Sequence, residues 1–288
     1  MAQPIAIAIH GGAGNILPTN LPPARAAEIE RYLTQVVEEG YMLLQQGRIA
    51  LEVVEIAVRR LEDAGYFNAG RGAVPNERGE IELDASIMDG KTRRAGAVAA
   101  ARKVQNPITL ARLIMERTAH VLIAGEGADS LAQLWQLPLR NENQPQEPPL
   151  WTYGTVGAVA LDKYGNLAAA TSTGGIMRKL PGRIGDSPLI GAGTYAENGV
   201  VAISATGQGE YFIRSVLTYD VAARMRYAHQ PLAEAVRSAF QERLEAIGGT
   251  GGVIAVSPQG EVFFYFNTPG MYRAGKDAQG KLQVGIFR

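Results

Sequence analysis

Three threonines that stand beside glycines are the residues of this sequence whose type and setting suit nucleophilic chemistry. Thr155 follows a glycine, Thr173 precedes a glycine pair, and Thr206 also precedes a glycine. A threonine hydroxyl is a weak nucleophile and needs a general base. The sequence has only three, widely separated histidines and no Gly-x-Ser-x-Gly elbow, so it does not indicate a serine-hydrolase triad.

Cleavage of the chain before Thr155 would provide the missing base. The α-amine that this cleavage frees has an ordinary pKa of about 7.7–8.0 and can take the proton from the threonine's own hydroxyl. Gly154 suits the scissile bond, because glycine reaches strained backbone conformations most easily. We therefore predict cleavage between Gly154 and Thr155. The alternative is that Thr155 is merely a β-branched strand residue.

The elements that must position these threonines follow from the spacing of apolar residues. Helical spacing predicts helices at residues 23–46, 49–63, 108–116, 128–135, 212–225 and 232–246. Short apolar segments between turn residues predict strands at 5–9, 80–88, 95–101, 155–161, 167–172, 200–205, 252–256 and 262–266. Each half of the chain thus supplies both strands and helices, which indicates an α+β protein.

A proline-rich, polar stretch divides the sequence in two. Residues 137–151 contain four prolines and a polar run, and they show no hydrophobic period. We interpret residues 137–154 as an exposed, flexible linker. Cleavage at its end would give an α subunit of residues 1–154 and a β subunit of residues 155–288.

The composition narrows the classes of partner. The formal net charge is zero, from 28 basic and 28 acidic side chains, which gives no reason to expect nucleic acid or an anionic membrane. No apolar run approaches the roughly 20 residues of a membrane span. The sequence has no cysteine, which fits a cytoplasmic protein, and with only three histidines a zinc site is not expected.

Short motifs accompany the threonines along nearly the whole chain. They lie at residues 10–14, 67–70, 83–85, 88–90, 125–128, 154–158, 171–175, 182–188, 206–210, 266–268 and 270–273. In this order they resemble the plant-type L-asparaginase / isoaspartyl aminopeptidase family of N-terminal-nucleophile hydrolases. The resemblance implies a four-layer αββα sandwich in which the two subunits form one folded domain.

The resemblance also implies catalytic roles for four residues that would lie near Thr155. Thr173 would hydrogen-bond the Thr155 hydroxyl, and Asn68 would support the nucleophile region. The Thr206 hydroxyl and the Gly207 amide would form an oxyanion hole, in which one donor is worth about 3 kcal/mol. The alternatives are strand packing for Thr173 and an ordinary glycine turn for the Thr206 pair.

The implied substrates are asparagine and β-aspartyl dipeptides, whose β-amide would be hydrolysed through a covalent β-aspartyl-enzyme. Arg183 would bind the substrate's α-carboxylate with two hydrogen bonds. Asp186 and the Gly209 carbonyl would hold the α-ammonium. The alternative for the charged pair is a surface ion pair. Arg178 stands where most relatives have a neutral residue, and we expect it to meet the carboxylate of a dipeptide's leaving group.

The family further implies a structural sodium ion and a dimer of αβ units. No cofactor is expected for the chemistry. The ion would be held by backbone carbonyls, which leave almost no signature in the sequence, and the aligned residues are Leu61, Glu62, Ala64, Phe67, Ala69 and Arg71.

Three other functions remain open at this point. A glycosylasparaginase-like amidohydrolase shares the nucleophile, although residues 206–210 and the absence of cysteine and of a secretory signal count against it. A threonine endopeptidase is disfavoured, because Arg183 and Asp186 would block an internal peptide. From a different class, the chain could be an uncleaved, inactive amino-acid-binding relative. The short linker is a further departure from the family, and a shorter linker would slow cleavage.

Overall fold

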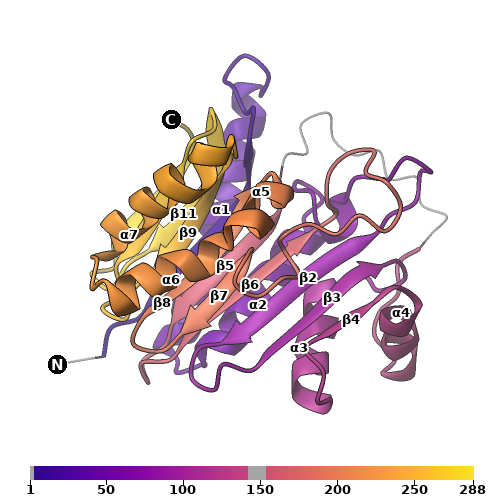
Figure 1. Ribbon diagram of the computed structural model, residues 1–288, viewed down its shortest axis with the longest axis horizontal. Coiled ribbons are helices and arrows are strands. Elements are labelled where there is room, and N and C mark those ends of the chain that lie inside the picture. The colour runs from indigo at the N-terminus through magenta and orange to yellow at the C-terminus, as the bar shows by residue number, and fades with distance from the viewer. Residues whose placement is uncertain (1–2, 142–153) are drawn as a thin grey trace.

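Two β-sheets face each other at the centre of the computed structural model, which describes residues 3–141 and 154–288 (Figure 1). The larger sheet has the strand order β12-β11-β1-β5-β6-β2-β3-β4, and the smaller has the order β10-β9-β8-β7. Neighbouring strands are antiparallel, except that β3 and β4 are parallel. The topology places β5, which Thr155 immediately precedes, and its neighbour β6 in the middle of the larger sheet.

The strand bounds are as follows. The larger sheet contains β1 (Ala6–Gly14), β2 (Leu83–Asp89), β3 (Ala95–Ala101), β4 (Leu122–Ala124), β5 (Val156–Leu161), β6 (Leu167–Thr173), β11 (Gly270–Lys276) and β12 (Leu282–Phe287). The smaller sheet contains β7 (Thr194–Glu197), β8 (Val201–Gly207), β9 (Gly251–Val256) and β10 (Val262–Phe266).

Helices cover the outer face of each sheet, which gives four layers. The larger sheet is covered by α1 (Pro23–Gln45), α2 (Ala50–Asp63), α3 (Pro107–Arg117) and α4 (Gly125–Leu134). The smaller sheet is covered by α5 (Gly209–Ser215), α6 (Leu217–Tyr227) and α7 (Leu232–Ala239). The predicted αββα sandwich is confirmed. None of the helices in the described ranges is long and apolar enough to span a bilayer.

Both faces of the larger sheet are buried, and β1 shows how. Ile7 and Ile9 pack toward the helices α1 and α2, whereas Ala6 and Ala8 belong to the core between the two sheets. Successive side chains of a strand point to opposite faces, so alternate residues supply the two cores. The same alternation fixes the strand ends that carry the site.

Several element boundaries differ from the sequence-based expectation. β1 continues to Gly14 instead of ending at residue 9, with a bulge between His10 and Gly12. Gly11 permits this, because a side chain there would overlap the Phe67 ring. The helix predicted at 212–225 is two helices, separated by Val216 in a left-handed conformation (φ 48°). The helix predicted at 232–246 leaves α geometry after Ala239.

Four short or irregular strands were not predicted, namely β4, β7, β11 and β12. The start of the predicted linker is bound to the protein, since Arg140 N donates to the Lys103 carbonyl (2.8 Å) and Gln105 N donates to the Pro138 carbonyl (2.9 Å). The rest of the linker, residues 142–153, lies outside the described residues.

Candidate active site

Thr155 immediately precedes β5, and its side chain meets the end of β6. Val156 on β5 pairs with Ser172 on β6, so the register brings Thr155 opposite Thr173. The Thr155 Oγ1 donates to the Thr173 Oγ1 at 3.1 Å. Both side chains are buried, with Thr155 6% exposed. The structure therefore brings the predicted nucleophile and its predicted partner together through the pairing of neighbouring strands.

Gly154 lies in a position that only glycine fits. Its φ is +82°, in the left-handed region. A Cβ at this position would overlap the Cα of Gly12 and lie 2.8 Å from the Ala13 nitrogen and 2.9 Å from the Thr206 Oγ1. The bond predicted to break thus lies between the β1 bulge and the hydroxyl of Thr206.

Thr206 and Gly207 end β8, directly beside Gly154. The Thr206 side chain is fully buried, and its Oγ1 accepts a hydrogen bond from Ala13 N at 3.2 Å. Gly207 and Thr155 both line one open cavity of about 490 Å³. The Gly207 amide at the wall of this cavity and the Thr206 hydroxyl beside Gly154 are donors of the kind that stabilise an oxyanion.

His10 holds the backbone of Thr155 and was missed as a site residue by the sequence analysis. Its Nδ1 donates to the Thr155 carbonyl at 2.9 Å, and its Nε2 then accepts from the Ser204 Oγ at 2.9 Å. Burial lowers the pKa of His10 to about 3, so the ring is neutral near pH 7. A histidine followed by glycines in an apolar strand was the only sequence signal for this role.

A chain of buried hydroxyls continues from Ser204 through both sheets. Ser204 Oγ lies 2.7 Å from Thr171 Oγ1, and Thr194 Oγ1 donates to Thr171 Oγ1 at 2.6 Å. Ser86 Oγ donates to Thr194 Oγ1 at 2.8 Å. Because buried polar groups are costly to leave unpaired, this chain fixes the sheets relative to one another behind the nucleophile.

Asn68 supports the turn that follows Thr173. Its Nδ2 donates to the Gly175 carbonyl at 2.6 Å, and its Oδ1 accepts from Val74 N at 3.0 Å. Gly175 N in turn donates to the Thr173 Oγ1 at 3.0 Å. Asn68 is therefore two hydrogen bonds away from the hydroxyl that contacts Thr155.

Arg183, Asp186 and Gly209 lie close together. A Cβ at Gly209 would lie 3.0 Å from the Arg183 Nη2 and 2.9 Å from the Asp186 Oδ1. Asp186 is buried, and burial raises its pKa to about 7. Its Oδ2 has no hydrogen-bond partner among the described residues. Arg183 is paired with Glu210, an acidic neighbour to which the sequence analysis assigned no role.

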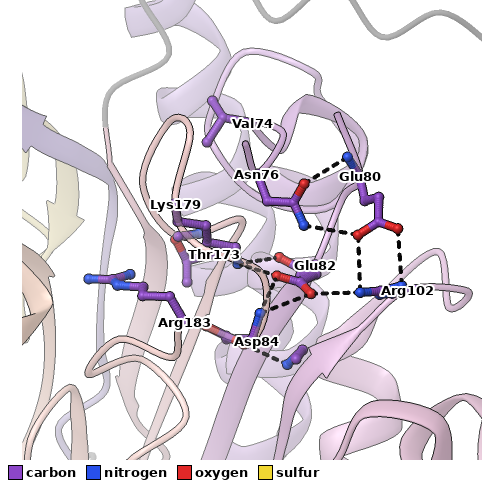
Figure 2. A network of polar contacts seen from close by, with 12 residues as sticks. Val74, Asn76, Glu80, Glu82, Asp84, Arg102, Thr173, Lys179 and Arg183 are labelled. Atoms are coloured by element: carbon purple, nitrogen blue, oxygen red, sulfur yellow. Dashed lines mark hydrogen bonds and ion pairs between the residues drawn. The ribbon is translucent and has the colours of Figure 1, made fainter. Parts of the chain in front are cut away.

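A buried charged network anchors the loop that carries Arg183 (Figure 2). Lys179 Nζ donates to the Glu82 carbonyl at 2.9 Å, and Gly182 N donates to both Glu82 carboxylate oxygens at 3.1 Å. Burial lowers the pKa of Lys179 and raises that of Asp84. Asp84 on β2 lies opposite Thr173 on β6 in the strand register. Arg102 Nη2 closes the network on Glu82 at 3.0 Å. These contacts tie the loop of residues 179–183 to Glu82, which immediately precedes β2.

Arg178 follows the cavity-lining Met177 in the chain, and its side chain is exposed. The part of the cavity wall that the described residues form includes Ile176 and Met177 but not Arg178. Arg178 is exposed with a positive φ of 58°, and its N donates to the Pro75 carbonyl at 3.0 Å. The exposed side chains of Ile176 and Met177 instead give this wall of the cavity an apolar character.

The residues aligned with a sodium loop surround the turn at Gly70–Gly72. The carbonyl oxygen of Glu62 lies 2.8 Å from where a Cβ of Gly70 would be, and those of Gly65 and Phe67 lie against Gly72 in the same way. Backbone carbonyl oxygens are ligands of the kind that a hard cation takes. No group of three or more His, Cys, Asp or Glu side chains that could hold a metal occurs in residues 3–141 and 154–288.

Comparison with known proteins identifies close relatives over the full length. A sequence model of the family described as Asparaginase matches residues 2–147 and 138–286. The isoaspartyl peptidase of Salmonella typhimurium is 47% identical, with 98% of each chain covered, and that of Escherichia coli is 46% identical, with 98% of this chain and 96% of its own covered. The probable isoaspartyl peptidase/L-asparaginase 2 of Arabidopsis thaliana is 40% identical, with 98% of each covered.

Proposed function

The chain belongs to the asparaginase family, and we propose that it hydrolyses the β-amide of L-asparagine and of β-aspartyl dipeptides after cutting itself before Thr155. The observation that carries this proposal is the position of Thr155. Its hydroxyl lies 3.1 Å from Thr173, and Gly154 beside it is pressed between the β1 bulge and Thr206. The family predicted from the sequence motifs is confirmed by the match to the family model and by the relatives.

Self-cleavage follows from this arrangement in two steps. The Thr155 hydroxyl adds to the carbonyl carbon of Gly154, and the peptide C–N bond breaks, which leaves an ester and a free α-amine. Water then hydrolyses the ester, so that residues 1–154 end in a carboxylate. The Thr206 hydroxyl, beside Gly154, is placed to stabilise the negative charge that develops on the attacked carbonyl.

Substrate hydrolysis repeats the same chemistry with the new α-amine as base. The amine takes the proton of the Thr155 hydroxyl, which attacks the β-carbonyl carbon of the substrate. The leaving amine departs with a proton, and water hydrolyses the β-aspartyl ester. Thr206 and the Gly207 amide stabilise the oxyanion in both halves, and Thr173 orients the nucleophile.

Recognition of the substrate rests on its amino-acid head. Arg183 binds the α-carboxylate, while the buried Asp186 and the Gly209 carbonyl bind the α-ammonium. Asparagine and a β-aspartyl dipeptide share this head and differ only beyond the β-amide, so one site serves both. The apolar Ile176 and Met177 would face the leaving group.

Three further features belong to the proposal. A sodium ion held by the carbonyls of Leu61, Glu62, Ala64, Phe67, Ala69 and Arg71 would order the loop that presents Asn68. Two αβ units would associate as a dimer. The cysteine-free composition supports a cytoplasmic location.

Matched initial rates on three substrates test the function. We expect hydrolysis of asparagine and β-aspartyl-leucine but not of α-aspartyl-leucine, whose amide is on the wrong carboxyl. Cleavage of the α-linked dipeptide would exclude recognition of the head by Arg183 and Asp186. Release of N-acetylglucosamine from a glycosylated asparagine, faster than ammonia from asparagine, would favour the glycosylasparaginase alternative.

A further inference from the structure

Glu210 forms a two-point ion pair with the arginine that we assign to substrate binding. Arg183 Nε donates to Glu210 Oε1 and Arg183 Nη2 donates to Glu210 Oε2, both at 2.9 Å. The carboxylate therefore occupies one edge of the planar guanidinium. The Glu210 side chain is 53% exposed, whereas that of Arg183 is 15% exposed, so the acid approaches the arginine from the solvent side.

Within residues 3–141 and 154–288, no hydrogen bond engages the opposite, Nη1 edge of the same guanidinium. A guanidinium has five N–H donors, and the pair with Glu210 uses two of them, on Nε and Nη2. Nη1 lies 2.9 Å from the Cβ position of Gly185, and Nη2 lies 3.0 Å from that of Gly209. Both nitrogens thus lie against the backbone of glycine residues, which have no side chain. Figure 2 shows that Arg183 extends away from Glu82 and Asp84, so these acids do not hold it.

We propose that Glu210 is a positioning residue for substrate recognition, which fixes Arg183 so that its free edge faces the α-carboxylate of the substrate. The proposal rests on the function proposed above and adds a residue to it. An arginine side chain loses rotamer entropy when a ligand fixes it, and holding it beforehand reduces this entropic cost of binding. Glu210 would therefore lower KM without contributing to the chemical step.

The opposite possibility is that Glu210 competes with the substrate for Arg183. Two observations favour positioning. The pair with Glu210 does not use Nη1, so a carboxylate can bind on that side without displacing Glu210. The Glu210 carboxylate is also half exposed, so water and salt screen its repulsion of an incoming carboxylate. The two possibilities predict changes in KM of opposite sign.

Glu210→Gln tests the proposal, with Glu39→Gln as the matched control. Glu39 forms the same two-point pair with Arg60 Nε and Nη2, at 3.1 and 2.9 Å, between α1 and α2 and away from the site. We expect Glu210→Gln to raise the KM for β-aspartyl-leucine and the inhibition constant of L-aspartate by roughly three- to tenfold, which corresponds to about 0.6–1.4 kcal/mol. kcat and self-cleavage should change less than about twofold, and Glu39→Gln should change none of these.

An Arg183→Lys background provides the second arm. A lysine cannot form the two-point pair. In this background Glu210→Gln should therefore have no further effect on KM. A lower or unchanged KM in the single variant, a loss confined to kcat, or the same increase in both backgrounds would overturn the role of Glu210. If the wild-type protein hydrolyses none of the substrates, it is the proposed function that fails, independently of Glu210.

Discussion

At the scale of single residues, burial decides which groups of the site carry charge. His10 is neutral near pH 7 because burial lowers the pKa of its ring to about 3. Its two ring nitrogens contact the Thr155 carbonyl and the Ser204 hydroxyl, so neither is free to take the proton of the Thr155 hydroxyl. This leaves the α-amine of Thr155 as the base and agrees with the absence of a histidine requirement in the proposed chemistry. Asp186 behaves differently, because burial raises its pKa to about 7.

The pKa of Asp186 predicts how ligand binding depends on pH. The substrate's α-ammonium needs the ionised carboxylate, which is lost from the free enzyme as the pH falls below about 7. Between about pH 5 and 7 the α-amine of Thr155 stays protonated, since its ordinary pKa is about 7.7–8.0. We therefore expect the inhibition constant of L-aspartate to rise by up to about tenfold per pH unit below 7.

Inhibition assays across this range measure the effect, with Asp186→Asn as comparison. The variant should bind L-aspartate weakly at every pH and show no such slope. A wild-type inhibition constant that is flat from about pH 5 to 7 would remove Asp186 from ammonium binding.

At the scale of elements, the site is built where strand ends meet loops from the other half of the chain. Asn68 comes from the loop after α2 and holds the turn after β6 through Gly175. The hydrogen bonds of Asn68 to Gly175 and Val74 are made inside the protein, where an unpaired donor or acceptor costs about 1–3 kcal/mol. The position of the Thr173 hydroxyl therefore depends on a residue 105 positions earlier in the chain.

We predict that Asn68→Ala lowers kcat by roughly 10- to 100-fold, with a smaller change in KM. The reason is that the turn after Thr173 loses its hydrogen bond from Asn68 to the Gly175 carbonyl. Asn198→Ala is a matched control at the other end of β6, where the Asn198 Oδ1 accepts from Leu167 N at 2.8 Å. Steady-state kinetics of both variants measure the difference. Equal losses in both would show that Asn68 contributes only to general stability.

The sequence predicted where most helices and strands lie along the chain, but not which of them pack against one another. The helical apolar period predicted α1 to within one residue, because this helix buries a regular face. A continuous apolar run predicted β3 to the residue, because this strand is buried on both faces. β4 has only three residues and β12 is partly exposed, so neither showed a clear pattern. The break at Val216 was missed because nothing in its residue type favours a left-handed conformation.

Some residues of the candidate site could likewise be predicted from the sequence, and others could not. Thr155 and its partners came from motifs that resemble a family. The contacts of His10 and Glu210 depend on which strands and loops meet in space, and the His10 ring reaches a residue 145 positions away. Arg178 was expected to meet the leaving group's carboxylate from its nearness in sequence to Arg183. It is exposed and does not line the cavity among the described residues, so this role stays a prediction.

At the scale of the whole molecule, one buried carboxyl joins α2, α3 and β6. Glu62 accepts hydrogen bonds from Ser172 Oγ (2.6 Å), Asn106 Nδ2 (3.0 Å) and Ile108 N (3.1 Å). Burial raises its pKa from 4.5 to about 8. The folded protein thus binds a proton that the unfolded chain has released between these two pH values, so the free energy of unfolding falls as the pH rises through this window.

Glu62→Gln should remove this dependence, because glutamine resembles the protonated side chain. We expect the thermal midpoint of the wild-type protein to fall between about pH 5 and 8 and that of the variant to fall less. Glu77→Gln, which changes an exposed carboxylate, serves as the control and should follow the wild type. Identical slopes for wild type and Glu62→Gln would show that Glu62 is ionised in the folded protein.

The central claim for the whole molecule is that it becomes two chains by cutting itself before Thr155. Intact-mass measurement and N-terminal sequencing of the purified protein test it most directly. We predict fragments of residues 1–154 and 155–288, with the second beginning Thr-Val-Gly-Ala, and a Thr155→Ala variant that stays uncut and inactive. A single uncut chain with full activity, or a fragment that begins at another residue, would contradict the account.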